Sequence, residues 1–304
     1  MKRLATSFTQ KICFNVSFLL FATLSLSAQE LSTVINRNDA TQLAVENKDI
    51  ESITILETAN VDPAAFASTG QTAKSKWAGK RIGFLGNSIT EFGEYVRAYA
   101  ALTGCEAVNY GVSATHMARV NSSDSQAFEV RCARMASNLD MVIVFGGTND
   151  FGHTNTAPFG TFGDGTKSGL YTFYAGLHRL FYNLTRRYRD KPIVVMTPVH
   201  HGTAIDCPEY IINSDGTLTE NTNPTTGKTF REYVDAIKEV AAYYSFIVLD
   251  AYRYSGLSPM AERTISGGYY FRDGLHLNDR GGERLARWMY PQLEQVYDMF
   301  YFGK

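Results

Sequence analysis

Short apolar runs alternate with longer amphipathic segments from residue 80 to the end of the chain. Each run is four or five residues long, is mostly apolar and shows no strict alternation with polar residues. The five runs cover residues 82–85, 107–110, 141–145, 193–196 and 246–249. Runs of this kind are typical of strands that are buried on both faces of a parallel sheet. The pattern therefore predicts five parallel strands.

Segments with a helical period lie between these runs. In residues 170–184 and 230–241, apolar side chains recur three and four positions apart, which indicates amphipathic helices. A helix that connects two parallel strands covers one face of their sheet. We therefore expect an α/β fold, with a central five-stranded parallel sheet in a three-layer α/β/α arrangement.

The loops that follow the strands are the first place to look for a site. In an open parallel sheet, ligands bind outside the carboxyl ends of the strands. Polar and glycine-rich segments follow all five predicted strands, the last of them after a further loop. They cover residues 86–88, 109–113, 146–150, 197–201 and 273–278.

Side chains suited to acyl transfer by a serine occur in these segments. Ser88 would be the nucleophile, His276 the base, and Asp273, three residues earlier, would orient the base. The backbone N–H groups of Ser88 and Gly111 and the side-chain amide of Asn149 would form the oxyanion hole. Helix caps, tight turns and a helix N-terminal charge explain each residue singly. All of these residues, however, are expected at one edge of one sheet, and this shared position favours a catalytic site.

These residues also carry a resemblance to a known family. Residues 86–90, Gly111, residues 147–150 and residues 273–276 resemble, in this order, the four sequence blocks of the SGNH hydrolases, also called GDSL esterases and lipases. The similarity spans about residues 80 to 300. One departure is Asn87, where the family commonly has Asp.

The resemblance implies a flavodoxin-like hydrolase that uses neither a metal nor an organic cofactor. It places the nucleophile on Ser88, the oxyanion donors on Gly111 and Asn149, and the acid and base on Asp273 and His276. The region from 29 to 78 has no counterpart in the minimal family pattern.

The first residues resemble a secretory signal peptide. Lys2, Arg3 and Lys11 precede an apolar run over 13–26, which is shorter than the roughly 20 apolar residues of a membrane-spanning helix. A residual membrane anchor is the alternative. We expect a signal peptide over 1–28, an N-terminal extension and linker over 29–78, and the hydrolase domain over 79–304. The mature protein would then be periplasmic or extracellular, without stable membrane insertion.

The charge of the chain bears on nucleic-acid binding, and its cysteine content bears on disulfide bonding. The net charge is −1, from 29 basic and 30 acidic residues, and no run of like charge could bind a phosphate backbone, so we expect no nucleic-acid partner. Cys105, Cys132 and Cys207 permit at most one internal disulfide, and buried free thiols are an equal alternative. The oligomeric state stays open.

Three further histidines are candidates for substrate binding. His116 follows the Gly111 segment, His153 follows the Asn149 segment, and His200 follows the fourth strand. Two long segments, 151–169 and 200–229, contain Gly, Thr, Asn and scattered aromatic residues, and they suit a polar rim better than an apolar acyl tunnel.

The combined expectation is an exported serine esterase that removes a small acyl group from a carbohydrate, and the acyl group we expect is acetyl. Two alternatives remain. One is a lysophospholipase or thioesterase that acts on longer acyl chains. The other is a non-catalytic, glycan-binding surface protein that keeps the fold.

Overall fold

The computed structural model describes residues 74–202, 206–258 and 268–301, together with four short strands nearer the N-terminus. The chain separates into two compact units, Met1–Ala73 and Lys74–Lys304. In the first unit, β1 (Phe14–Asn15) pairs with β4 (Ile55–Leu56), and β2 (Ser32–Asn36) pairs with β3 (Gln42–Glu46). Apart from these strands, the expected signal peptide and most of the expected extension lie outside the described residues.

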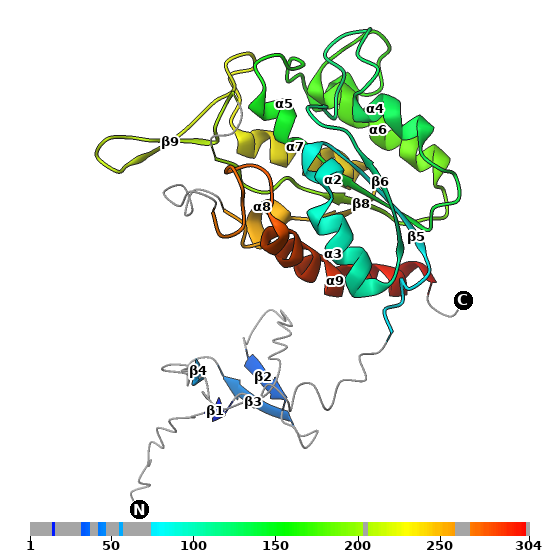
Figure 1. The fold of residues 1–304 in the computed structure, drawn as a ribbon, viewed down its shortest axis with the longest axis vertical. Helices are drawn as coiled ribbons and strands as arrows, with labels where there is room; N and C mark the ends of the chain where they lie inside the picture. The colour runs from blue at the N-terminus through cyan, green and yellow to red at the C-terminus, as the bar shows by residue number, and fades with distance from the viewer. Residues whose placement is uncertain are drawn as a thin grey trace, which may run out of the picture. The chain divides into compact units, whose positions relative to one another are not determined.

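The second unit is built on a five-stranded parallel sheet (Figure 1). The strand order is β11-β8-β7-β5-β6, which corresponds to 2-1-3-4-5 in chain order, the order of flavodoxin-like folds. The predicted fold class is therefore confirmed, and each predicted strand differs from the observed one by at most one residue at either end. The strands are β5 (Arg81–Gly86), β6 (Glu106–Gly111), β7 (Met141–Phe145), β8 (Ile193–Met196) and β11 (Ile247–Leu249).

The central strand β7 shows why the sheet needs helices on both faces. All five of its side chains are buried. Because successive side chains of a strand point to opposite faces, Val142 and Val144 join one apolar cluster, whereas Met141, Ile143 and Phe145 join the other.

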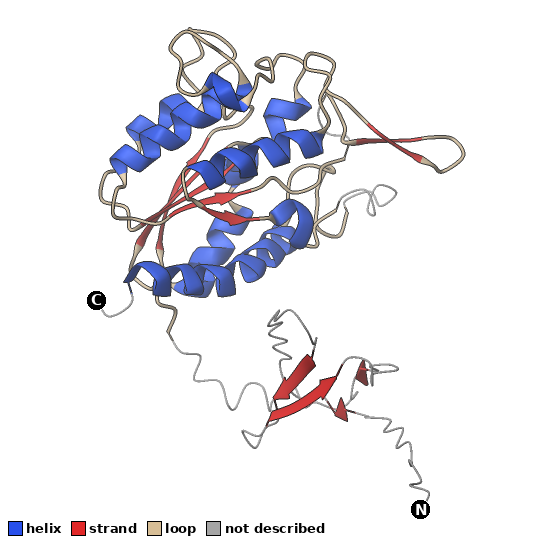
Figure 2. Cartoon of the chain, turned by 180° about the vertical axis from the view of Figure 1, so that it is seen from behind, coloured by secondary structure: helices blue, strands red, loops and turns tan. Residues whose placement is uncertain are grey.

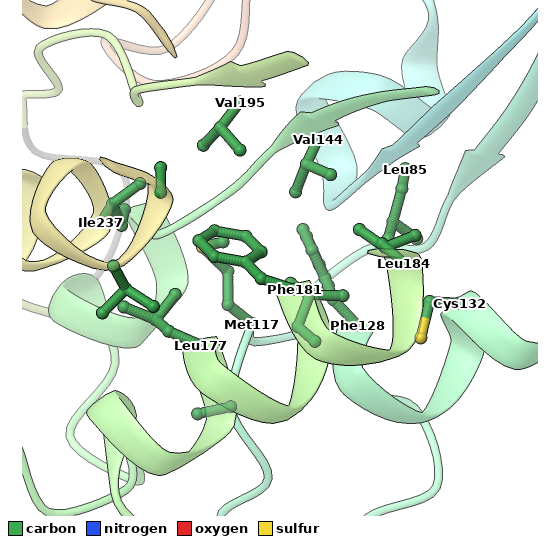
Figure 3. Packing of buried hydrophobic residues seen from close by; sticks show 14 of the residues in the cluster. Leu85, Met117, Phe128, Cys132, Val144, Leu177, Phe181, Leu184, Val195 and Ile237 are labelled. Carbon is green, nitrogen blue, oxygen red and sulfur yellow. The ribbon is translucent and has the colours of Figure 1, made fainter. Parts of the chain in front are cut away.

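The first cluster lies under α4 (Phe128–Arg131), α6 (Phe173–Arg187) and α7 (Phe230–Tyr243). Figure 3 shows Leu177 and Phe181 of α6 packed in this cluster with Val144 and Val195 of the sheet. Full burial of one such side chain contributes about 1.5–3 kcal/mol. The two amphipathic segments that the sequence predicts thus correspond to α6 and α7, and their apolar side chains face the sheet.

The second cluster lies on the opposite face of the sheet (Figure 2). It is covered by α2 (Ser88–Phe92), α3 (Glu94–Thr103) and α9 (Asp279–Tyr301), and α3 packs along α9. Among the described residues, no helix has both the length and the apolar character that a bilayer crossing would need.

The long segment 200–229 differs from a simple polar loop. It contains a hairpin of β9 (Tyr210–Ile212) and β10 (Leu218–Glu220), which projects from the body of the unit in Figure 1. Residues 213–217 form its turn, in which Gly216 has a φ of 83°. The remaining short elements are α5 (Thr148–Gly152), α8 (Ala251–Tyr254), η2 (Cys132–Arg134) and η3 (Phe162–Asp164).

The structure decides between one internal disulfide and free thiols for the three cysteines. Cys105, Cys132 and Cys207 are all buried free thiols. Burial raises the pKa of each of the three thiols, which disfavours the reactive thiolate.

Candidate active site

Ser88 lies where β5 gives way to α2. Asn87 caps this helix, because its Oδ1 accepts a hydrogen bond from the Ile89 N–H at 3.1 Å. Asparagine thus provides the acceptor oxygen that a cap requires. Gly86 is needed before it, since a Cβ at that position would lie 1.8 Å from Thr90 Oγ1. Ser88 is consequently the first residue of a capped helix, held at the edge of the sheet.

A continuous chain of hydrogen bonds joins three side chains at this point. His276 Nε2 lies 2.9 Å from Ser88 Oγ, and His276 Nδ1 lies 2.6 Å from Asp273 Oδ2. The other carboxylate oxygen, Oδ1, accepts from the backbone N–H groups of Leu275 at 3.0 Å and His276 at 2.7 Å. This arrangement can move a proton from the serine hydroxyl to the imidazole.

The charge state of Asp273 determines which nitrogen of the ring accepts that proton. Burial opposes ionisation, but the hydrogen bonds from the His276 ring and from two backbone N–H groups outweigh it, so the pKa of Asp273 lies below its usual value. Asp273 is therefore a carboxylate at neutral pH. A carboxylate only accepts hydrogen bonds, so the proton of a neutral His276 ring stays on Nδ1 and Nε2 is left to accept from Ser88.

Several contacts hold the loop that carries His276. Arg272 forms an ion pair with the buried Glu94 of α3, and its Nε donates to the Leu277 carbonyl at 3.0 Å. On the other side of the loop, the Gly202 N–H donates to the Gly274 carbonyl at 2.6 Å. The base is therefore tied both to α3 and to the segment after β8.

Asn149 lies in the first turn of α5 and points toward the loop after β6. Its Nδ2 donates to the Thr115 carbonyl at 2.9 Å. The next residue, Asp150, accepts hydrogen bonds from the Met117 N–H at 3.0 Å and the Ala118 N–H at 3.2 Å. The second N–H of the Asn149 amide has no partner among the described residues and can meet an anionic oxygen.

Gly111 does not fit its expected role as an oxyanion donor. It is the last residue of β6, and its N–H donates to Asn109 Oδ1 at 2.8 Å. A Cβ on Gly111 would lie 2.1 Å from the Glu91 backbone nitrogen. Glycine is needed here because α2 packs directly on the strand end, and its N–H is already occupied.

Ala114 offers the free N–H that Gly111 lacks. It has a φ of 58°, which is rare for a residue with a side chain, and it precedes the Thr115 carbonyl that binds Asn149. Within the described part of the chain, nothing accepts a hydrogen bond from its N–H. Sequence reasoning missed this residue, because an alanine gives no signal of a left-handed backbone.

The close packing of Gly111 allows a test. We expect Gly111→Ala to lower the free energy of unfolding by about 1–3 kcal/mol, the usual cost of an overpacked site. The matched control is Gly163→Ala, where a Cβ would meet only Thr161 Oγ1, at 3.8 Å. Urea denaturation of both variants measures the difference. Equal stability of Gly111→Ala and the wild type would contradict the packing role.

Two of the three candidate binding histidines lie together beside Asn149. The centroids of the His116 and His153 rings are 5.5 Å apart with an angle of 71° between the ring planes, and the backbone N–H of His153 donates to the Asn149 carbonyl at 3.0 Å. Burial, and then the nearby His116, lower the pKa of His153, which favours a neutral ring. The buried Nε2 of His116 has no partner among the described residues.

His200 has different partners. Its Nδ1 lies 2.9 Å from the carboxylate of the fully buried Glu209, which also accepts from the Tyr252 hydroxyl at 2.5 Å. Sequence reasoning had no signal for Glu209, which lies within a segment interpreted as a polar rim. In the described residues, no three His, Cys, Asp or Glu side chains gather as a metal centre would require.

Comparison with known proteins gives the family. The sequence profile of the GDSL-like Lipase/Acylhydrolase family matches residues 84–284. A crystal structure of a protein from Lactobacillus plantarum is similar, at 26% identity and a TM-score of 0.58, over 74% of this chain and 99% of that chain. Another similar crystal structure has 27% identity and a TM-score of 0.59, over 73% and 99%.

The structure of a possible lipase from Chitinophaga pinensis shares the fold, at 17% identity and a TM-score of 0.52, over 71% of this chain and 98% of that chain. No curated protein matches the chain. The family match covers well over half of the sequence and includes all four blocks of the SGNH pattern, which confirms that resemblance. The chain belongs to the GDSL-like lipase/acylhydrolase family, and this membership implies that it hydrolyses esters.

Proposed function

We propose that the chain is a serine esterase in which Ser88 is the nucleophile, His276 the general base and Asp273 the group that orients the base. The observation that carries the proposal is the unbroken hydrogen-bond chain from Asp273 through His276 to Ser88 Oγ. Each link has the distance that proton transfer needs.

The reaction would proceed in two steps. Ser88 Oγ attacks the ester carbonyl while its proton passes to His276 Nε2, and the alcohol leaves with that proton. Water then attacks the acyl-Ser88 ester, again with His276 as base, and releases the carboxylic acid. The N–H groups of Ser88 and Ala114 and the amide of Asn149 would donate to the anionic oxygen of both tetrahedral intermediates.

The substrate we propose is a carbohydrate outside the cytoplasm that carries a small O-acyl ester, and the acyl group we propose is acetyl. Two features support this choice. The backbone N–H of His153 donates to the Asn149 carbonyl, and its partly exposed ring, which packs against His116, would contact the hydroxyl groups of a sugar. The signal-peptide pattern before residue 29 suits a substrate of the cell exterior.

A series of p-nitrophenyl esters tests the acyl preference. We expect kcat/KM to be highest for acetate and to fall by at least about tenfold by octanoate, because a polar site gains little from buried methylenes. Release of acetate from acetylated polysaccharides would then identify the alcohol. Activity that rises beyond eight carbons would instead favour a lysophospholipase or thioesterase.

The non-catalytic alternative has its own test. A fluorophosphonate probe labels a serine only when a base activates it. Labelling of the wild-type protein at Ser88 would support the esterase. An unlabelled protein with native circular dichroism would favour a glycan-binding role.

A further inference from the structure

Arg131, the last residue of α4, is a buried cation that contacts the ends of two strands. Only 7% of the surface of Arg131 is exposed to solvent. Nε donates to the Gln126 carbonyl at 2.6 Å, and Nη1 donates to the Tyr110 carbonyl at 2.6 Å. Nη2 donates both to the Gly86 carbonyl and to Thr115 Oγ1, at 2.9 Å each. All four acceptors are neutral oxygens.

A buried arginine normally pairs with a carboxylate. In the described part of the chain, no carboxylate lies within ion-pair distance of Arg131. Glu129, two residues earlier on α4, is paired with Arg179 instead. Besides these hydrogen bonds, the face of the Phe128 ring lies 5.0 Å from the Arg131 Cζ and favours the cation. The guanidinium is thus a positive charge without a neutralising partner.

This group remains charged at neutral pH. Burial, and then the nearby Arg134, lower the pKa of Arg131 to about 10. The acidic groups that act on it in the opposite sense are Cys132, Glu91 and Asp124, and among the described residues no hydrogen bond or ion pair joins the guanidinium to any of them. Its charge therefore acts on the surrounding loops with little compensation.

The acceptors of Arg131 belong to the segments that build the active site. The Gly86 carbonyl lies two residues before Ser88, at the end of β5. The Tyr110 carbonyl lies near the end of β6. The Thr115 hydroxyl belongs to the residue whose carbonyl binds Asn149. One rigid planar group therefore fixes the nucleophile turn relative to the loop that contains Ala114.

We propose that Arg131 is a positioning residue for ester hydrolysis, which holds the Ser88 turn and the loop over 112–115 in register and favours negative charge on the oxygen bound between them. This inference rests on the proposed function. The oxygen becomes anionic only during the reaction, so the contribution of Arg131 belongs mainly to the transition state. It should therefore affect kcat more than KM.

The test compares three full-length variants with the wild type. Arg131→Gln removes the charge, Arg131→Lys keeps the charge but loses the planar fork, and Arg134→Gln removes a charge from an exposed neighbour. We expect Arg131→Gln to lower kcat for p-nitrophenyl acetate by about 10- to 100-fold, with KM changed by less than about threefold. Arg131→Lys should recover part of this loss, and Arg134→Gln should match the wild type.

Two further readouts separate positioning from a merely structural role. Methaneboronic acid forms an anionic tetrahedral adduct on a catalytic serine, so its affinity should fall in Arg131→Gln by about the same factor as kcat. Fluorophosphonate titration counts the competent sites. If Arg131 had only a structural role, Arg131→Gln would have fewer competent sites but an unchanged kcat per labelled site. That result would overturn the proposal.

The failures of the two proposals are distinguishable. A wild-type protein that is neither labelled nor active defeats the proposed function itself. An active wild type with unchanged kcat and boronate affinity in Arg131→Gln defeats only the role of Arg131. If Arg131→Gln does not fold, Arg131→Lys and Thr115→Val decide: losses of both kcat and boronate affinity support the role, and wild-type values in both variants overturn it.

Discussion

Replacing Ser88 by alanine is expected to lower kcat for p-nitrophenyl acetate by about 10⁶-fold, the loss seen when the catalytic serine of a triad is removed. In the proposed mechanism the Ser88 Oγ attacks the ester, and the alanine side chain offers no nucleophile in its place. The mutation removes one hydrogen bond, from Ser88 Oγ to His276 Nε2, and leaves the Asn87 cap intact. The free energy of unfolding should therefore change by only about 1 kcal/mol.

The measurement is the steady-state rate of ester hydrolysis together with fluorophosphonate labelling. Ser137→Ala is a matched control, because Ser137 is exposed and has no role in the site. It should retain wild-type activity and labelling. A Ser88→Ala protein that keeps even a tenth of the wild-type kcat would show that the nucleophile lies elsewhere.

The second large effect is expected for Asp273→Asn. The asparagine oxygen can still accept from the Leu275 and His276 N–H groups, so the loop keeps its shape. Its NH₂ group, however, would donate to His276 Nδ1 and force the ring proton onto Nε2. A protonated Nε2 cannot accept from Ser88, and kcat should fall by about 10³- to 10⁴-fold.

Asp279→Asn is the control for this change, since it makes the same replacement at an exposed position in the first turn of α9. It should lower stability by less than about 1 kcal/mol, through the lost interaction with the helix dipole, and leave kcat unchanged. If Asp273→Asn also keeps its kcat, the orientation of His276 does not depend on Asp273.

The sheet could be predicted from the sequence because its strands are buried on both faces. Such strands require continuous apolar residues, and the runs at 141–145 and 193–196 match β7 and β8 without error. The rule that sites form at the carboxyl ends of parallel strands then selected the segments with Ser88, Asn149 and His276. The structure places Ser88, His276 and Asp273 within hydrogen-bond distance.

The sequence could not predict features that depend on contacts between distant segments. Gly111 suggested a free N–H, but the side chain of Asn109 occupies it and the neighbouring α2 explains the glycine. Arg131 gave no signal, because its acceptors are backbone carbonyls and a hydroxyl, which carry no distinctive residue pattern. The hairpin over 210–220 was hidden by its short strands and exposed apolar side chains.

The pairing of Ser88 with His276 also has a consequence for biosynthesis. The two residues are 188 positions apart, and the base immediately precedes α9, which packs along α3. If a partly synthesised or partly refolded chain forms the sheet before α9 docks, the contact between Ser88 and His276 is absent, and we expect that chain to be inactive. Recovery of ester hydrolysis during refolding should therefore lag behind the recovery of helical circular dichroism. The rate of ester hydrolysis would therefore measure how far α9 has docked during refolding.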